Sequence, residues 1–474
     1  MKKTFLLLAI AVSTLFVSCF EDNDDNTQLS SAVEIQDFIW RGLNFFYLYK
    51  GDTPELADDA FATDEEFISF LGSFDSPESF FEFLKSSRDR FSIIVSDFTE
   101  LENALAGTSQ SNGMEFGLVL YPDDSNRVFG YVRYVLPNTS AEAEGLQRGI
   151  IFNTVDGVQL MAQDDGSGNL TFDNSIFDPA TYSIGLATYD GIEVTPTGNS
   201  VSLTKQEYTE NPIFIANTLD INGQKIGYLM YNAFTNEFDS QLNAAFAQFQ
   251  ADGVTELVVD LRYNGGGSVR TATYLASMIT GQFTDQTFFT EQWNDDRQAE
   301  FAEDGVFPST FINGGEAINS LNLTTVYALT TSRTASASEL VINGLVPYIN
   351  VVQIGDNTTG KYQASFLMYD SPNFQKTVDL NPNHTYAMLP LVFQTANANG
   401  FTDFEDGLVP DIFQEEDLSN LGVLGDPGEP LLAAAIQEIT GVPVPGTRTP
   451  AISMQILSES KASSPTYQVM VVDQ

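Results

Sequence analysis

The sequence predicts a multidomain α/β protein with three folded parts: a small helical part, a β-rich part and a large mixed α/β part. The spacing of apolar residues is helical over 33–106, changes to a period of two over 112–206, and alternates between buried strands and helices over 212–440. At 474 residues and 43% hydrophobic content, the chain is long enough for about three domains with buried cores.

Composition excludes several classes of function. Acidic residues outnumber basic ones 64 to 20, and a net charge of −44 argues against a nucleic-acid partner, which needs basic patches. The chain has one histidine, His384, and one cysteine, Cys19, so a multi-histidine metal site and an intrachain disulfide are excluded. We therefore expect no metal and no cofactor, and a structural or solvated role for His384.

The first residues have the pattern of a targeting segment. Residues 1–18 combine two lysines with an apolar run, as in a signal peptide, and Cys19 follows Phe-Val-Ser as in the lipobox of bacterial lipoproteins. We expect lipidation of Cys19, although an ordinary signal peptide with an incidental cysteine stays open. Residues 19–32 form an acidic linker that resembles signals for the outer cell surface. A lipid anchor in the outer membrane, within the cell envelope, is the expected location, on its periplasmic or its surface face.

Residues 33–106 show repeated helix signals. Apolar residues recur at three- and four-residue spacing from Val33, and Thr63-x-x-Glu66 and Ser76-x-x-Ser79 are typical helix starts. The aromatic residues at 45–49 are expected to lie in the core.

The β-rich part, 112–206, contains the expected strands 114–121, 127–135 and 150–155. The run 139–157 resembles a PDZ domain through Ala141, Gly145, Leu146, Gly149, Val155, Asp156 and Gly157. The resemblance implies that a peptide's C-terminal carboxylate binds the loop formed by Gly113, Met114, Glu115, Phe116 and Gly117. An ordinary β domain with glycine turns is the alternative, and residues 169–190 are expected to form an insert.

Two stretches of the mixed part, 212–440, carry the candidate chemistry. A buried strand at 257–259 leads into Asp-Leu-Arg-Tyr-Asn-Gly-Gly-Gly at 260–267, whose glycines let the backbone approach a ligand closely. In the second stretch, a strand at 325–329 precedes a helix starting near Ser336, and a strand at 351–354 precedes a turn ending on Lys361. Ser336-x-x-Glu339 matches a helix capping box, but a helix N-terminus also suits an oxyanion. We interpret Ser336 as a nucleophile and Lys361 as its base; a cap and a surface lysine are the plain alternatives.

Taken together, the glycine run, Thr-Ala-Ser-Ala-Ser-Glu at 334–339 and Gly-Leu-Val-Pro-Asp at 407–411 resemble the C-terminal processing (tail-specific) serine peptidases. The resemblance implies a PDZ domain before a catalytic core of repeated ββα units, as in the ClpP/crotonase type. It also implies Ser336 as nucleophile, Lys361 as base, and backbone N–H groups of Ala337 and Gly266 as the oxyanion hole. Many members have a glutamine four residues after the lysine. That position is Ser365 here, with Gln363 two residues earlier, and either is expected to orient the lysine.

The predicted function is thus a serine endopeptidase that cleaves proteins or peptides near their C-termini and binds them by their C-terminal tails. Its lysine base needs a pKa lowered from about 10.4 towards about 7–8, which an apolar pocket supplies by desolvation. The alternative is a non-catalytic, PDZ-bearing surface lipoprotein that binds peptides. Residues 441–474 read as a C-terminal tail without a predicted place in the fold.

Overall fold

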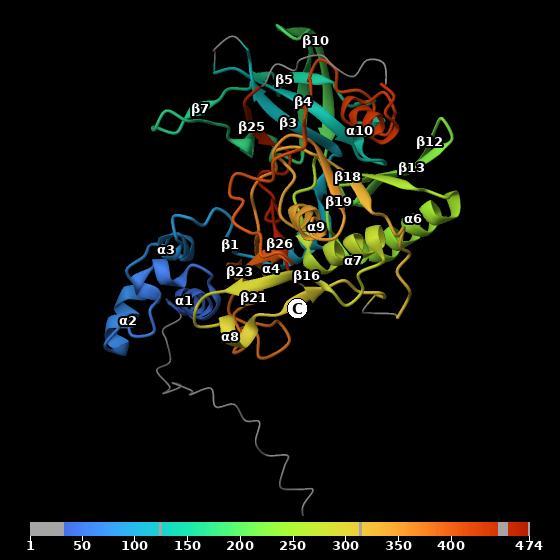
Figure 1. Ribbon diagram of the computed structural model, residues 1–474. Helices are drawn as coiled ribbons and strands as arrows, with labels where there is room; N and C mark the ends of the chain where they lie inside the picture. Colours follow the sequence, from blue (N-terminus) through green and yellow to red (C-terminus); the bar gives the residue numbers. More distant parts are fainter. Residues whose placement is uncertain (1–32, 123–125, 312–314, 444–453, 473–474) are drawn as a thin grey trace, which may run out of the picture.

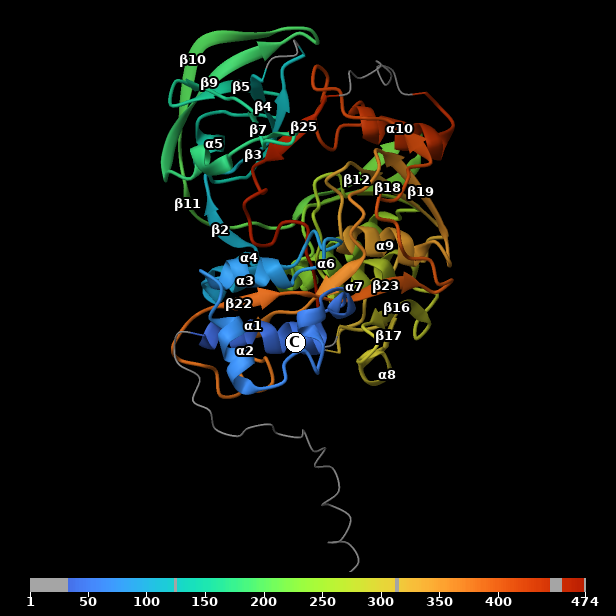
Figure 2. The same ribbon diagram turned by 90° about the vertical axis from the view of Figure 1, so that its left-hand side faces the viewer.

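The computed structural model describes residues 33–122, 126–311, 315–443 and 454–472. The predicted signal peptide, the acidic linker and Cys19 lie outside the described residues. In both views the β-rich part lies at the top, helices α1–α3 lie below, and the mixed α/β part connects them (Figures 1 and 2). None of the described helices is long and apolar enough to cross a bilayer.

The N-terminal part contains four α-helices: α1 (Glu34–Phe46), α2 (Asp64–Leu71), α3 (Pro77–Leu84) and α4 (Phe98–Leu105). Thr63 and Ser76 cap α2 and α3, as their sequence patterns indicate. This part is not an independent helical body. Strand β1 (Ile93–Val95) pairs with β22 (Ala387–Leu389) of the mixed part, and the Phe46 and Phe366 rings pack edge to face at 4.8 Å. Both parts therefore share one hydrophobic core.

The β-rich part is a twisted antiparallel sheet in the order β10-β9-β5-β4-β3-β25. The predicted strands are confirmed as β3 (Met114–Leu120), β4 (Val128–Val135) and β5 (Ile151–Val155). The expectation of an insert at 169–190 is wrong, because β9 (Thr181–Tyr189) pairs with both β5 and β10 (Val194–Thr204). Its Tyr182 and Ile184 alternate into the core, a strand pattern hidden by the polar residues around it.

The mixed part has a six-stranded sheet whose order is β12-β13-β14-β18-β19-β24, parallel from β13 onwards. The strands are β12 (Ile213–Ile221), β13 (Gln224–Tyr231), β14 (Glu256–Asp260), β18 (Thr325–Thr330), β19 (Asn350–Gly355) and β24 (Ile412–Phe413). Three helices pack together in the shared core: α6 (Asp239–Asp252), α7 (Val269–Thr280) and α9 (Ala337–Leu345). Helix α10 (Pro430–Thr440) belongs to a separate apolar cluster with β13, β14, β18 and β19.

A second sheet lies beside the glycine run, in the order β15-β26-β20-β23-β16-β17. Its strands are β15 (Gly267–Ser268), β26 (Met470–Val471), β20 (Gln363–Ser365), β23 (Leu391–Asn397), β16 (Thr287–Trp293) and β17 (Asp304–Val306). Residues 454–472, which we call the 454–472 segment, do not form a separate tail. Their strand β25 (Ile456–Glu459) extends the β-rich sheet, and β26 completes this second sheet.

Candidate active site

Ser336 lies at the N-cap of α9 in a strained backbone conformation. Its φ of 66° and ψ of −117° are unfavourable for any residue with a Cβ. The side chain is fully buried, and its Oγ has no hydrogen-bond partner among the described residues. Ser336 and Glu339 have the arrangement of a capping box, and its Glu339 half is formed, because Glu339 accepts the N–H of Ser336. The serine half makes no hydrogen bond of normal geometry with a described residue, which leaves the hydroxyl free for another role.

Glu339 connects the serine to the lysine. Its Oε2 accepts the backbone N–H of Ser336 at 2.6 Å and that of Lys361 at 2.9 Å. Its Oε1 accepts the N–H of Gly360 at 2.7 Å and the hydroxyl of Thr358 at 2.5 Å. Burial raises the pKa of this carboxyl to about 7, although its four donors favour the ionised form. The sequence indicated only a capping role for Glu339, whereas the structure makes it the common support of both candidate residues.

Lys361 is buried where an ammonium group is poorly solvated. Its Nζ lies 5.1 Å from the centre of the Phe91 ring. Burial lowers the pKa of Lys361 to about 7, and the negative charges of Asp89 and Glu339 oppose that shift. Asp89 and Phe91 come from the N-terminal part, and no recognisable motif in the sequence indicated that they approach the lysine.

The glycine run passes directly beside Ser336. A Cβ built on Gly266 would lie 2.6 Å from Ser336 Cβ and 2.3 Å from the carbonyl oxygen of Val469. The N–H of Gly266, predicted as an oxyanion donor, donates to Asn264 Oδ1 at 2.9 Å, and that of Gly267 donates to Val469 O at 2.7 Å. The other predicted donor, the N–H of Ala337, is the first in α9 and has no acceptor within the helix.

We expect Gly266→Ala to lower the free energy of unfolding by about 1–3 kcal/mol, because the added Cβ meets Ser336 and the φ of 110° disfavours a side chain. Gly265→Ala is the matched control, since its Cβ would approach no atom closer than 3.4 Å and its φ is not positive. Denaturant unfolding of the two variants measures the difference. Equal stability would contradict the close approach at Gly266.

The residues predicted to orient Lys361 are both buried in β20. The side-chain amide of Gln363 donates to the Tyr49 hydroxyl at 3.0 Å, and its Oε1 has no hydrogen-bond partner among the described residues. Ser365 pairs with Val471 of β26. Among the hydrogen bonds of the described residues, none joins either side chain to Lys361 Nζ, so their orienting role stays a prediction. The Nε2 atom of His384 is hydrogen-bonded to the Asp370 carboxylate at 3.0 Å, which agrees with a structural role for this histidine.

The prediction that residues 113–117 form a loop for a peptide carboxylate is wrong, because Met114 to Gly117 are the first residues of strand β3 and pair with β4. The N–H of Met114 donates to Asn112 Oδ1 at 3.0 Å, and that of Phe116 donates to Ser460 Oγ at 3.3 Å. The edge of β3 is covered by β25 from the 454–472 segment. Among the described residues, no group of three or more histidine, cysteine or acidic side chains is arranged to hold a metal ion.

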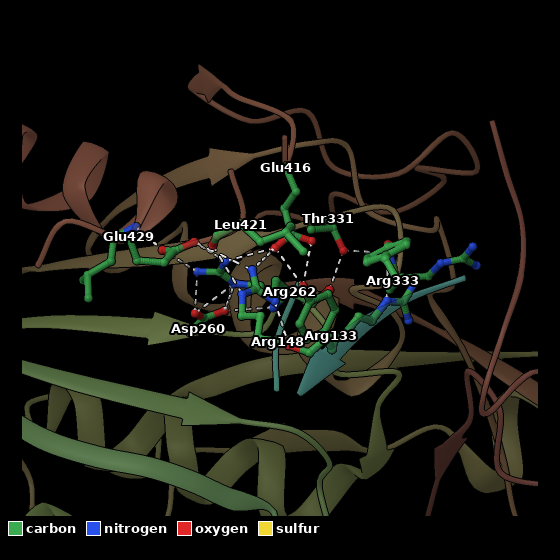
Figure 3. A network of polar contacts seen from close by, with 12 residues as sticks. Arg133, Arg148, Asp260, Arg262, Thr331, Arg333, Glu416, Leu421 and Glu429 are labelled. Atoms are coloured by element: carbon green, nitrogen blue, oxygen red, sulfur yellow. Dashed lines mark hydrogen bonds and ion pairs between the residues drawn. The ribbon is translucent and has the colours of Figure 1, made fainter. Parts of the chain in front are cut away.

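A buried polar network contacts residues 331–336, the loop that leads to Ser336, which we call the serine loop (Figure 3). The fully buried guanidinium of Arg262 contacts Asp260, Glu416 and Glu429 at 2.6–3.1 Å. Arg148 from the β-rich part donates to Glu416 at 2.6 Å. The backbone oxygen of Arg262 accepts the hydroxyl of Thr331. The network therefore ties the β-rich part, the central sheet and the serine loop together.

Comparisons with known proteins agree with this architecture. Residues 225–381, which include Ser336 and Lys361, match the model of peptidase family S41, and residues 34–93 match the peptidase S41 N-terminal domain. A protein from Bacteroides fragilis NCTC 9343 described as an S41 protease has 29% identity and a TM-score of 0.65, over 85% of this chain and 97% of that one.

Two curated relatives extend the comparison. The carboxyl-terminal-processing protease of Picosynechococcus is 25% identical over 51% of this chain and 54% of its own length. The chloroplastic C-terminal processing peptidase of Tetradesmus obliquus is 24% identical over 68% of this chain and 63% of its own. The chain thus spans between half and two thirds of these relatives. It belongs to peptidase family S41.

Proposed function

We propose that the protein is a serine endopeptidase that cleaves protein or peptide chains near their C-termini. Ser336 is the nucleophile and Lys361 the general base. The proposal rests above all on one observation: a buried serine with an unbonded Oγ and a buried lysine with a pKa near 7 are held by the same carboxylate oxygen of Glu339. Cleavage near C-termini is proposed because the curated relatives are named as C-terminal processing proteases.

In the proposed mechanism, neutral Lys361 Nζ takes the proton of Ser336 Oγ while Oγ attacks the scissile carbonyl carbon. The N–H of Ala337 stabilises the oxyanion, and the N–H of Gly266 joins it when released from Asn264 Oδ1. When the C–N bond breaks, the ammonium of Lys361 gives its proton to the leaving amine. Lys361 then takes a proton from a water molecule that attacks the acyl carbonyl carbon, and it returns this proton to Ser336 Oγ as the ester bond breaks.

Substrate capture falls to the β-rich part. A PDZ-like function would use the edge of β3, which strand β25 of the same chain occupies in this structure. A substrate chain would add to that edge as a strand in place of β25, with its end at residues 113–117, where β3 begins. Lipid anchoring through Cys19 in the outer membrane would place the enzyme in the cell envelope.

The pH dependence of cleavage tests the proposed base. Because only neutral Lys361 accepts a proton and its pKa is about 7, kcat/KM should fall as the pH drops below about 7, by about tenfold per pH unit. If activity also needs ionised Glu339, which has a similar pKa, the fall becomes steeper and approaches about a hundredfold per pH unit. The measurement is the cleavage rate of an unstructured protein from about pH 5.5 to 8.5. A flat profile between pH 6 and 8 would rule out a base with this pKa.

A further inference from the structure

The 454–472 segment first meets the β-rich part along the edge proposed for substrates. Strand β25 runs antiparallel to β3, with Ile456 opposite Val119 and Glu459 opposite Gly117. It therefore runs towards residues 113–117 at the start of β3, where Ser460 Oγ accepts the N–H of Phe116 at 3.3 Å and donates to Glu115 at 2.6 Å. On its other side, the backbone oxygen of Glu459 accepts an N–H of the Asn174 side chain at 2.9 Å.

The same segment ends beside the candidate nucleophile. Strand β26 lies parallel to both β15 and β20, and so between the glycine run and the strand that follows Lys361. The carbonyl oxygen of Val469 accepts the N–H of Gly267 at 2.7 Å, and the N–H of Val472 donates to Ser365 O at 2.9 Å. Since a Cβ on Gly266 would touch both Val469 O and Ser336, this peptide group and the serine border the same small space.

One cavity joins the two places. It has a volume of about 590 Å³, and its lining includes Glu115 and Phe116 of β3, Gly265 and Gly266 of the glycine run, and residues 460–461 and 463–466 of the segment. In Figure 2 the red chain descends from β25 towards the mixed part. The segment thus follows a single path from the edge of β3 to Ser336.

We propose that the 454–472 segment occupies in cis the path of a substrate chain, and that the enzyme is latent until a substrate displaces it. This inference rests on the proposed function. It also indicates a class of substrate: an extended chain with apolar residues in the register of Val469, Met470 and Val471. Val469 and Val471 enter one apolar cluster with Leu101, Leu367 and Leu389, and Met470 enters the shared core.

Arg333 couples the segment to the serine loop. It lies three residues before Ser336, and its guanidinium is 3.3 Å from Glu459 and donates to the Tyr467 hydroxyl at 2.8 Å. Glu459 also pairs with Arg133 of β4. Arg133 and Arg333 lie at the same end of the polar network (Figure 3). Withdrawal of Glu459 and Tyr467 would remove two partners of Arg333 and free the loop to rearrange.

Cutting the segment after folding provides the test, since a shortened chain would lack strands of two sheets and could misfold. A recognition sequence for a site-specific protease is inserted within residues 444–453, and the purified full chain is cut once and diluted. We expect kcat/KM on an unstructured protein to rise by about 10²-fold, the usual gain when a tethered competitor becomes free. Adding the synthetic peptide 456–472 should suppress the rate again, and a scrambled peptide should not. The uncut protein with the same insertion is the control.

An unchanged cleavage rate after the segment has separated, as judged by gel filtration, would overturn the inference that the segment blocks the substrate path. A milder variant, Tyr467→Phe, should raise the rate of the uncut chain, because it loses the contact with Arg333. Binding of a labelled 456–472 peptide to cut Ser336→Ala protein separates the two proposals. If no form cleaves but the unstructured protein displaces the peptide, the proposed function fails and the shared path stands. If it displaces nothing, the shared path fails.

Discussion

Ser336→Ala and Lys361→Met should each reduce kcat for cleavage of an unstructured protein by at least about 10³-fold. The first change removes the attacking oxygen and the second removes the group that takes its proton. Both variants should stay folded, because Ser336 Oγ makes no hydrogen bond among the described residues and Lys361→Met replaces a poorly solvated amine with an apolar chain of similar length. The assay is best made with the 454–472 segment cut.

Two matched variants separate catalysis from structure. Ser76→Ala removes a serine from another capping box, that of α3, and should cost about 1 kcal/mol of stability with no change in kcat. Lys225→Met removes a lysine at an exposed ion pair with Asp220 and should also leave kcat unchanged. If Ser336→Ala kept more than about a tenth of the activity, the nucleophile would lie elsewhere.

Glu339→Ala should have the largest effect on folding, about 3–5 kcal/mol in the free energy of unfolding. The change leaves the buried N–H groups of Ser336, Gly360 and Lys361 without an acceptor, together with the Thr358 hydroxyl. Unsatisfied buried donors cost about 1–3 kcal/mol each, and partial relaxation keeps the total below their sum. Activity should fall as well, since the serine loop and the lysine turn lose their common support.

The control for this variant is Glu438→Ala, at an exposed position of α10, which should change stability by less than about 0.5 kcal/mol. Denaturant titrations of both variants, with activity at matched folded fractions, give the comparison. A stable Glu339→Ala protein would mean that water or a local rearrangement satisfies the donors, and Glu339 would then not be the element that aligns Ser336 with Lys361.

Local patterns predicted much of this fold from the sequence. The caps at Thr63 and Ser76, the strands at 114–120 and 128–135, and the helix after Ser336 follow from periodicity and capping chemistry, which act over a few residues. The sequence also predicted that Ser336 and Lys361 lie close together. Each follows a strand of one parallel sheet, and the carboxyl ends of neighbouring parallel strands lie side by side.

Contacts between distant segments could not be predicted in this way. Asp89 and Phe91 reach Lys361 from the N-terminal part, and β25 and β26 pair with strands whose residues lie more than a hundred positions earlier. Such pairings depend on exposed edges left by the rest of the fold, and the apolar runs of residues 454–472 do not identify their partners. The sequence predicted correctly that Glu339 belongs to a capping motif. It did not predict that Glu339 accepts the N–H groups of Gly360 and Lys361, because tertiary packing brings that turn to the carboxylate.

The strained backbone at Ser336 bears on how this chain has been selected. A left-handed conformation of this kind costs a serine about 1–3 kcal/mol that glycine would largely avoid. No hydrogen bond from Oγ to a described residue compensates that cost. In a chain that had lost its catalytic role, mutation to glycine would gain stability and lose nothing, so drift would favour it. The serine at this position therefore costs stability without a compensating bond to a described residue, which a chemical role for Oγ explains and a merely peptide-binding lipoprotein does not.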